Sequence, residues 1–217
     1  MGYGHEQLGD RSHWRYGMGE GSKRPTANAQ GSALQLKLTL RGVSKPPVWR
    51  RLVVAADMHL DRLHDVIQTS MGWTDTHLHM FSTATGDYGV PDPELGFRNE
   101  RSTQVGQFLK QQDDRISYTY DFGDGWEHDI VLEKRLDPGP EAHLPACTGG
   151  KGACPPEDCG GPWGYADVKA TIVDPGHEDH DHMLDWLGLE SAEEFDPAAF
   201  DLAEINEVLN MTTAARR

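Results

Sequence analysis

The sequence predicts an α+β protein built on a mainly antiparallel sheet of about five strands, in the order β-β-α-β-α-β-β, followed by C-terminal helices. Two observations predict this class. Residues 33–136 contain several short segments in which apolar and polar residues alternate, and residues 165–209 carry apolar residues at helical spacing. Turns rich in Gly and Asp separate neighbouring strands, which indicates hairpins.

The first two strands are predicted to pair as a hairpin. Every second residue of the segment 34–40 is leucine, which is typical of a strand with one buried face. The turn-forming residues 42–47 follow, and residues 48–54 supply the second strand.

A helix is predicted next, with Asp57 as its N-cap and Gly72 as its C-terminal stop. Its apolar residues recur every three or four positions and so form one stripe that can face the sheet. These residues are Leu60, Leu63, Val66, Ile67 and Met71.

The remaining strands follow after this helix. Residues 76–85 form the third strand, and a short helix is expected at residues 102–110. Residues 115–122 and 126–136 alternate in polarity on either side of the Gly123-Asp124-Gly125 turn, so they predict a second hairpin.

Three helices are predicted at the C-terminal end, over residues 165–173, 178–187 and 197–209. Gly188 ends the second of them, and Asp196-Pro197 begins the third as an N-cap followed by proline at the first helical position.

The domain organisation follows from composition. Residues 1–30 are rich in glycine and have no apolar periodicity, so they predict a disordered leader. Residues 31–210 predict a single domain, and residues 211–217 a short tail. We find no signal peptide and no apolar run near the roughly 20 residues of a membrane helix, and therefore expect a cytoplasmic protein without a membrane partner.

The charge distribution argues against nucleic acid as the main partner. The chain carries a formal net charge of −15, which repels phosphate over most of a surface. The exception is the first hairpin, where residues 31–56 contain five basic residues and no acidic one. Weak nucleic-acid binding through this hairpin is therefore a third functional option.

The three cysteines lie within thirteen residues, at Cys147, Cys154 and Cys159. In a reducing compartment, clustered cysteines of odd number point to metal binding or to reactive thiols more often than to disulfides. Their spacing is not the Cys-x-x-Cys of a zinc knuckle, but a Gly- and Pro-rich loop can present thiolates at irregular spacing. One prediction is a structural Zn²⁺ site of the three cysteines with His128 as its fourth ligand; His143, and after it His77 or His79, are the other candidates for that place. The alternatives are that the thiols only pack the loop or that one of them is a reactive thiol.

A second metal site is predicted at His77 and His79. Residues two apart on a strand point to the same face, so both imidazoles can converge on one ion. Carboxylates of the second hairpin turn, such as Asp121 and Asp124, can complete the site together with His128. The alternative interpretation is that these Asp and Gly residues only shape the turn.

Several segments resemble a known family. They are Pro47–Arg51 (PVWRR), Gly72–Trp73 with His77–His79 (GW and HLH), Tyr120–His128 (YDFGDGWEH) and Cys154–Tyr165 (CPPEDCGGPWGY). With these motifs the chain resembles the plasmid pRiA4b ORF-3-like family over residues 34–209, also labelled as insertion-element passenger TnpR proteins. The resemblance implies a compact α+β fold and a cytoplasmic protein sometimes encoded on mobile genetic elements, but no activity. The TnpR label suggests a resolvase, but the chain lacks a recombinase serine motif and a basic DNA-binding helix.

Two functional hypotheses stand first. One is a non-enzymatic accessory or regulatory module that binds a protein partner through an aromatic patch of Trp126, Trp163 and Tyr165. The other is a metal-dependent hydrolase that uses His77, His79 and His128 with a neighbouring aspartate to activate water.

Overall fold

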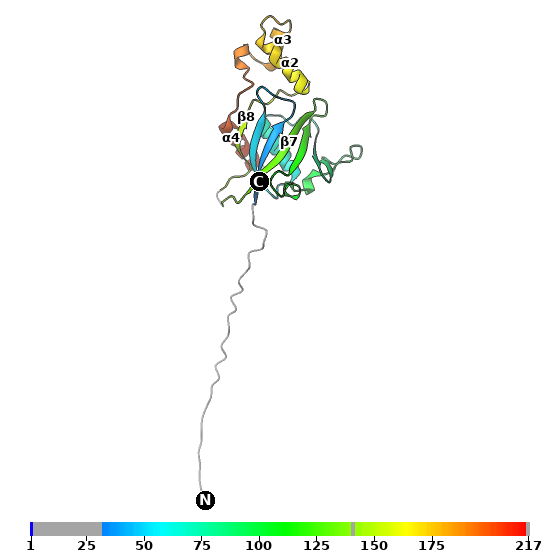
Figure 1. Cartoon of the computed structure of the whole chain (residues 1–217), viewed down its shortest axis with the longest axis vertical. Coiled ribbons are helices and arrows are strands. Elements are labelled where there is room, and N and C mark those ends of the chain that lie inside the picture. The colour runs from blue at the N-terminus through cyan, green and yellow to red at the C-terminus, as the bar shows by residue number, and fades with distance from the viewer. Residues whose placement is uncertain (2–31, 140–141, 216–217) are drawn as a thin grey trace.

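The structure is a computed structural model that describes Met1, residues 32–139 and residues 142–215 (Figure 1). The predicted leader of residues 1–30 lies outside the described residues apart from Met1. The described part forms a mixed α+β fold around one eight-stranded, mostly antiparallel sheet with the strand order β5-β4-β3-β6-β7-β1-β2-β8. The α+β class and its antiparallel sheet are therefore confirmed.

The strands agree with the predicted order, but there are eight of them and not five. The additional strands are short: β4 and β5 follow β3, and β8 lies in the cysteine segment. Sequence periodicity does not detect them because they are glycine-rich or only two residues long. The strands are β1 (Ala33–Leu40), β2 (Trp49–Ala55), β3 (His79–Thr83), β4 (Gly86–Gly89), β5 (Arg98–Asn99), β6 (Arg115–Tyr120), β7 (Trp126–Leu136) and β8 (Ala146–Lys151).

The α-helices of the described chain are α1 (Leu60–Met71), α2 (Gly161–Val173), α3 (His180–Leu187) and α4 (Leu202–Ala215). The predicted helix at 102–110 is wrong, since only the 3₁₀ turns η1 (Glu100–Ser102) and η2 (Val105–Gln107) form there. A third 3₁₀ turn, η3 (Ala192–Glu194), precedes α4. None of the described helices is long and apolar enough to cross a membrane.

Several helix boundaries differ from the prediction. Helix α1 has His59 and not Asp57 as its N-cap, α2 begins at Gly161 and not at residue 165, and α3 begins at His180 and not at residue 178. Helix α4 begins at Leu202 and not at Pro197, because the Asp201 carboxylate accepts hydrogen bonds from the Ala203 and Glu204 amides and so caps the helix. It continues to Ala215, so most of the predicted tail is helical.

The core lies between α1 and one face of the sheet. The leucines of β1 at positions 34, 36, 38 and 40 are buried, and so is the predicted apolar stripe of α1. Gly72 ends α1 in the left-handed conformation, as predicted. This packing fixes α1 and the segment that leaves it, residues 73–79, against the sheet.

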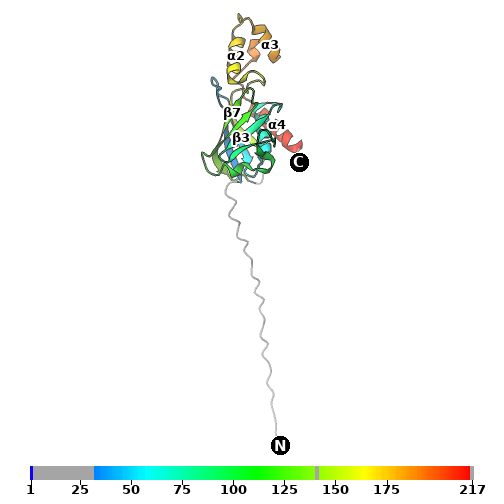
Figure 2. The ribbon, with the colours of Figure 1, turned by 90° about the vertical axis from the view of Figure 1, so that its right-hand side faces the viewer.

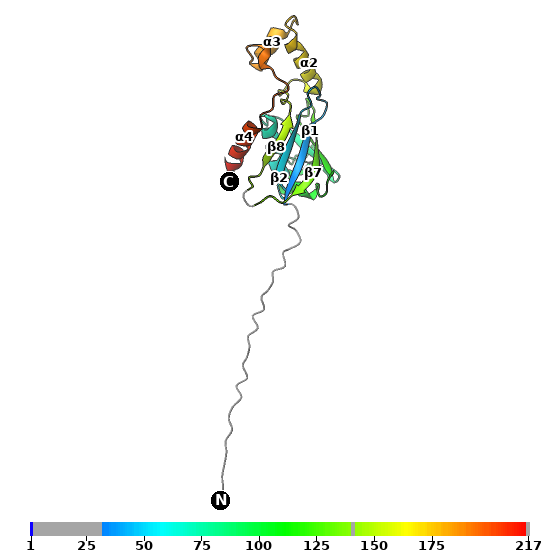
Figure 3. The same cartoon turned by 60° about the vertical axis from the view of Figure 1, so that its left-hand side comes forward.

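The other three α-helices of the described chain lie outside this core, two beyond one end of the sheet and one beside its edge. Helices α2 and α3 lie together beyond one end of the sheet, as Figures 1 and 2 show. Helix α4 lies beside the edge strand β8 (Figure 3), where the Asn206 side chain accepts from the Cys147 amide and donates to the Cys147 carbonyl, both at 2.9 Å. These two bonds satisfy backbone groups at a sheet edge.

The arginines of the basic first hairpin have partners within the protein. Arg41 pairs with Glu127 and Asp129 of β7, and Arg51 pairs with Glu133 of the same strand. Arg50 is buried and donates to backbone carbonyls, including that of Ser70 at 2.8 Å. The hairpin therefore offers a nucleic acid less free positive charge than its sequence suggests.

The loop before α2 contacts the β6–β7 turn. The Asp124 carboxylate accepts from the Gly160 amide at 3.1 Å, and Gly161 lies against the Asp124 carbonyl. A Cβ atom at Gly161 would stand 2.2 Å from that carbonyl oxygen, so only glycine fits.

We predict that Gly161→Ala destabilises the protein more than Gly188→Ala. Both glycines have φ +69°, so alanine costs about 1 kcal/mol of backbone strain at either position. Only Gly161 also meets a backbone carbonyl, which adds roughly 2 kcal/mol of overpacking. Urea unfolding measures both free energies, and equal losses would contradict this account of the loop.

A second prediction concerns His128 and pH. This side chain is fully buried between aromatic rings, and burial lowers its pKa to about 4. Between pH 6.5 and 4 the unfolded chain binds a proton at this residue that the folded chain does not, so stability falls as the pH is lowered through that range. The full loss attributable to His128 is about 3 kcal/mol.

The measurement is the free energy of unfolding by urea at pH 7.5 and pH 4.5. In His128→Gln the drop between these values should be smaller than in the wild type. His182→Gln, which removes an exposed imidazole, should leave the drop unchanged. If His128→Gln lost as much unfolding free energy between pH 7.5 and pH 4.5 as the wild type, His128 would not be the source of this pH dependence.

Candidate functional site

The described part of the chain contains two groups of three side chains that could bind a metal ion. Within each group, the three possible ligand atoms lie within 4.8 Å of one another. The first, called here the turn cluster, consists of His77, Asp121 and Asp158. The second, called here the pocket cluster, consists of His64, Asp75 and His79. Neither group contains a cysteine.

The turn cluster joins three segments that are distant in sequence. His77 lies two residues before β3, Asp121 directly follows β6, and Asp158 lies in the loop before α2. Strand β3 pairs with β6, and the Asp121 amide continues the ladder by donating to the Leu78 carbonyl at 2.9 Å. The contacts of Gly160 with Asp124 bring the third segment to the same place.

In the turn cluster, Nε2 of His77 lies close to two carboxylates but has no hydrogen-bond partner. His77 Nε2 lies 3.2 Å from Asp158 Oδ1 and 3.8 Å from Asp121 Oδ2. This nitrogen is closed to solvent, and its alignment with Asp158 does not meet that of a hydrogen bond. Asp121 uses Oδ1 to accept from the Gly123 amide at 2.9 Å, so Oδ2 remains available to face His77.

The aspartates of both clusters have unusual backbone conformations. Asp75, Asp121 and Asp158 have φ values of 58°, 54° and 58°. They are three of the five described non-glycine residues with positive φ; the others are Lys45 and Asp113. Such conformations cost energy and gather at functional sites, and aspartate tolerates them better than most residues.

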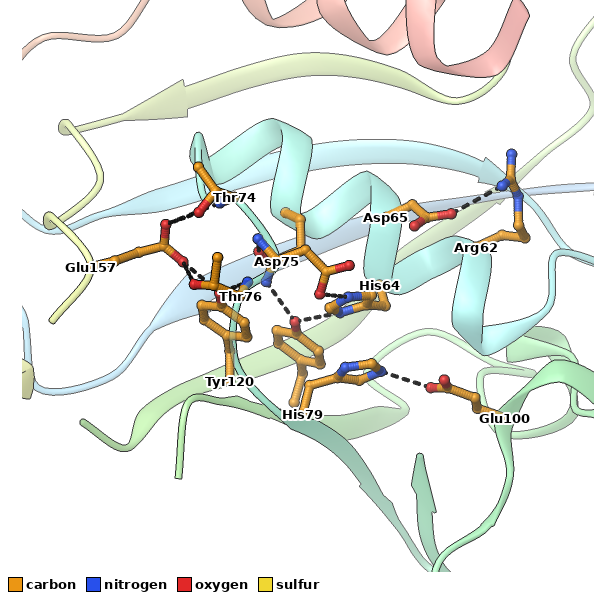
Figure 4. A network of polar contacts seen from close by, with 12 residues as sticks. Arg62, His64, Asp65, Thr74, Asp75, Thr76, His79, Glu100, Tyr120 and Glu157 are labelled. Carbon is orange, nitrogen blue, oxygen red and sulfur yellow. Dashed lines mark hydrogen bonds and ion pairs between the residues drawn. The ribbon is translucent and has the colours of Figure 1, made fainter. Parts of the chain in front are cut away.

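A hydrogen-bonded network joins Glu157 to Tyr120 and Thr74 (Figure 4), and the Tyr120 ring contacts that of His77, with centroids 5.8 Å apart. Tyr120 donates its hydroxyl to Glu157 at 2.5 Å, and Thr74 donates to the same carboxylate from its amide and its hydroxyl. Burial raises the pKa of Tyr120 to about 12, so it stays a neutral donor. Burial opposes ionisation of Glu157, but the bonds from Thr74 and Tyr120 outweigh it and lower the pKa of that carboxyl, which stays charged.

The pocket cluster is built from α1, the segment after it and the start of β3. The rings of His64 and His79 are stacked, with centroids 3.5 Å apart and planes 8° from parallel. His64 Nε2 lies 2.8 Å from Asp75 Oδ1, and His79 Nε2 lies 2.8 Å from Glu100 Oε2 (Figure 4). Glu100 is only 2% exposed, so each imidazole has its own carboxylate.

His64 also contacts the core. Its Nδ1 lies 2.7 Å from the hydroxyl of Tyr118, to which Gln68 donates at 3.0 Å. Burial, and after it the neighbouring His79, lowers the pKa of His64 to about 4, so the ring is neutral at neutral pH. A neutral imidazole is the form that binds metal ions.

A pocket of about 240 Å³ opens beside both clusters. Its lining holds four carboxylates and three imidazoles, among them His77 from the turn cluster and all three residues of the pocket cluster. The lining residues are Asp61, His64, Asp65, Asp75, His77, Leu78, His79, Val90, Glu100 and Arg101.

The predicted convergence of His77 and His79 is wrong. Strand β3 begins at His79, so His77 lies outside the strand and the two side chains do not share a strand face. The structure assigns them to different clusters. His128 joins neither, because it is fully buried and its Nδ1 contacts the Trp126 carbonyl.

The sequence did not identify His64 or Asp158 as site residues. For His64 a signal exists: positions 60, 64, 67 and 71 form a helical stripe, and His64 is its one ionisable member. Asp158 has no comparable signal, because its role depends on how the loop before α2 contacts the β6–β7 turn.

The cysteines do not assemble into one group. Cys147 is buried in β8, while Cys154 and Cys159 lie in the loop before α2. Burial raises the pKa of Cys159 to about 12 and also raises that of Cys154, so both side chains are neutral thiols at neutral pH in the metal-free protein. The Cys147, Cys154, Cys159 and His128 zinc site stays a prediction without geometric support.

The predicted aromatic patch is wrong for two of its three residues. Trp126 is fully buried against Trp73, and Tyr165 is only 2% exposed. Trp163, at the first turn of α2, is 86% exposed and is the one member available to a partner. Alternation placed Trp126 correctly on a strand face but did not reveal that the face lies in the core.

Comparisons with known proteins agree with these observations. Residues 32–204 match the family described as plasmid pRiA4b ORF-3-like protein. The chain is 39% identical over 182 residues to the uncharacterized protein y4hQ of Sinorhizobium fredii (strain NBRC 101917 / NGR234). This match covers 82% of this chain and 91% of y4hQ.

A solved structure shares the fold. The crystal structure of MM3350, a protein of unknown function from Methanosarcina mazei Go1, is similar with a TM-score of 0.70 and 34% sequence identity. The likeness covers 79% of this chain and 96% of that one. By its family match over residues 32–204 and its similarity to y4hQ, the chain belongs to the plasmid pRiA4b ORF-3-like protein family.

Proposed function

We propose that this protein is a metal-dependent hydrolase that binds a divalent cation at the turn cluster of His77, Asp121 and Asp158. One observation carries the proposal. Each of these residues belongs to a different segment among those on which the family resemblance depends, HLH, YDFGDGWEH and CPPEDCGGPWGY, and the fold brings their ligand atoms within 4.8 Å.

The charge of the turn cluster supports a bound cation. Asp121 and Asp158 lie close together, and Glu157 adds a third carboxylate beside them. Among the ion pairs of the described residues, neither Asp121 nor Asp158 pairs with lysine or arginine; each pairs only with His77. Gathering carboxylates in this way is unfavourable unless a positive charge compensates for them.

The ligand types favour a first-row divalent ion such as Zn²⁺ or Mn²⁺. Imidazole nitrogen and carboxylate oxygen together suit these ions, and three protein ligands leave a coordination position for water, as in catalytic zinc sites. The Asp158 side chain is 71% exposed, so solvent and substrate can reach this position. Water on such an ion loses its proton near neutral pH and becomes a nucleophile.

The first test is metal binding by the full chain. We expect Asp158→Asn to lower Zn²⁺ affinity at least about 10-fold, because asparagine removes a charged ligand. Asp113→Asn is the matched control, since Asp113 is exposed, has φ 70° and belongs to neither cluster. Isothermal titration calorimetry measures both affinities.

Two results would contradict the metal assignment. One is unchanged Zn²⁺ affinity in Asp158→Asn. The other is a thiolate-to-cobalt charge-transfer band in the Co²⁺-loaded protein that disappears on changing Cys154 or Cys159 to serine, which would assign the metal to the cysteines.

The second test is hydrolysis itself. Protein loaded with Zn²⁺ or Mn²⁺ should hydrolyse a chromogenic carboxylic or phosphoric ester, and Asp158→Asn should reduce the rate at least about 10-fold while Asp113→Asn does not. Metal bound at the turn cluster without metal-dependent hydrolysis of either ester class would refute the hydrolase and leave a structural cation site.

A further inference from the structure

We infer that the substrate of the proposed hydrolase is an uncharged carboxylic ester with an apolar acyl group. Three exposed side chains, called here the apolar rim, would hold this group beside the turn cluster: Leu78, Val90 and Phe122. This choice of substrate rests on the proposed function and narrows it from two ester classes to one. It draws on where apolar side chains are exposed and on the charge of the pocket.

Two residues of the apolar rim directly follow members of the turn cluster. Leu78 follows His77 and is 55% exposed, and Phe122 follows Asp121 and is 41% exposed. The hydrogen bond from the Asp121 amide to the Leu78 carbonyl, at 2.9 Å, holds these two segments side by side. Exposed apolar side chains that gather beside a candidate site indicate a surface that an apolar ligand covers.

Ring contacts and the pocket connect the apolar rim. Leu78 and Val90, which is 46% exposed, both line the pocket of about 240 Å³. Val90 follows Gly89, where a Cβ atom would stand only 2.9 Å from the ring of Phe97. The Phe97 ring in turn contacts that of Phe122, with centroids 6.2 Å apart. The apolar surface therefore extends from the pocket to the β6–β7 turn.

The charge of the pocket disfavours a phosphoric ester. Among the described residues, only one of the four carboxylates in its lining, that of Asp65, pairs with an arginine, Arg62. Arg101 is the single arginine of the lining, so negative charge prevails there. Sites that transfer phosphoryl groups stabilise the anionic oxygens with arginine, lysine or metal ions. An uncharged carboxylic ester does not meet the repulsion that a phosphoric ester would.

The pocket and the turn cluster can act on one substrate because His77 belongs to both. An acyl chain in the pocket begins beside the candidate metal ligands. Hydrolysis of such an ester requires only water as a second reactant. The bond between the acyl carbon and the alcohol oxygen breaks, the water oxygen bonds to the acyl carbon, and a proton of the water passes to the alcohol oxygen. The products are a carboxylic acid and an alcohol.

The experiment measures hydrolysis of p-nitrophenyl acetate, hexanoate and phosphate by the full chain loaded with Zn²⁺. We expect kcat/KM for the hexanoate to exceed that for the acetate at least about 10-fold, because the added methylenes leave water on the apolar rim. Leu78→Ser and Phe122→Ser should each lower this ratio at least about 3-fold. Leu202→Ser is the matched control, because Leu202 is 39% exposed and lies in α4, beside the opposite edge of the sheet.

A binding measurement makes the acyl preference independent of turnover. Hydroxamic acids bind a metal ion through two oxygens, so acetohydroxamic and hexanohydroxamic acid compare two chain lengths without hydrolysis. Calorimetry on the Zn²⁺-loaded chain should show that hexanohydroxamic acid binds at least about 5-fold more tightly. Leu78→Ser should reduce this preference, and Leu202→Ser should keep it.

The outcomes separate the substrate from the proposed function. Equal rates and equal affinities for the two chain lengths would overturn the apolar ester and leave a metal-dependent hydrolase without this preference. Faster metal-dependent hydrolysis of the phosphate than of the hexanoate would also overturn it. A chain-length preference in binding that Leu78→Ser removes, without hydrolysis of any ester, would refute the hydrolase and support the apolar binding site.

Discussion

The antiparallel pairing of β3 with β6 is the constraint on which both clusters depend. It places His79 opposite Tyr120 and continues through the hydrogen bond from the Asp121 amide to the Leu78 carbonyl. The segment between Gly72 and β3 must therefore run between the end of α1 and the β6–β7 turn. Its side chains reach α1 on one side and the turn on the other, so a single backbone pairing creates two groups of possible metal ligands.

Backbone strain at three aspartates is the cost of this arrangement. Asp75, Asp121 and Asp158 each have a positive φ. A residue other than glycine adopts this backbone conformation at a cost of about 1–2 kcal/mol. Asp121 recovers part of that energy by capping its own turn, and Asp75 recovers part by accepting from His64. Asp158 has no comparable bond beyond its approach to His77. Backbone strain that no hydrogen bond of the same residue compensates is more consistent with a functional role for Asp158 than with a purely structural one.

The fold was predictable where local pattern and tertiary environment agree. The alternating leucines of β1, the α1 stripe ended by Gly72 and the β6–β7 hairpin form as predicted, because periodicity reports which face is buried. β8 did not follow from local pattern, since its glycine-rich sequence is a strand only because it pairs with β2. The candidate site was predictable in part: His77 and Asp121 were identified, but their partner Asp158 comes through a loop contact that no periodicity encodes.

The same loop shows why its cysteines attract attention in the sequence but do not form a ligand group in the structure. Trp73 donates its indole N–H to the Pro155 carbonyl at 3.0 Å, and Gly160 donates to Asp124, so both ends of the loop are fixed. Between these anchors lie Glu157 and Asp158, whose carboxylates face Tyr120 and His77. Burial favours the neutral form of the nearby thiols, and they pack against the core. Among the described residues of this segment, it is therefore Asp158 and not a cysteine that joins a group of possible metal ligands.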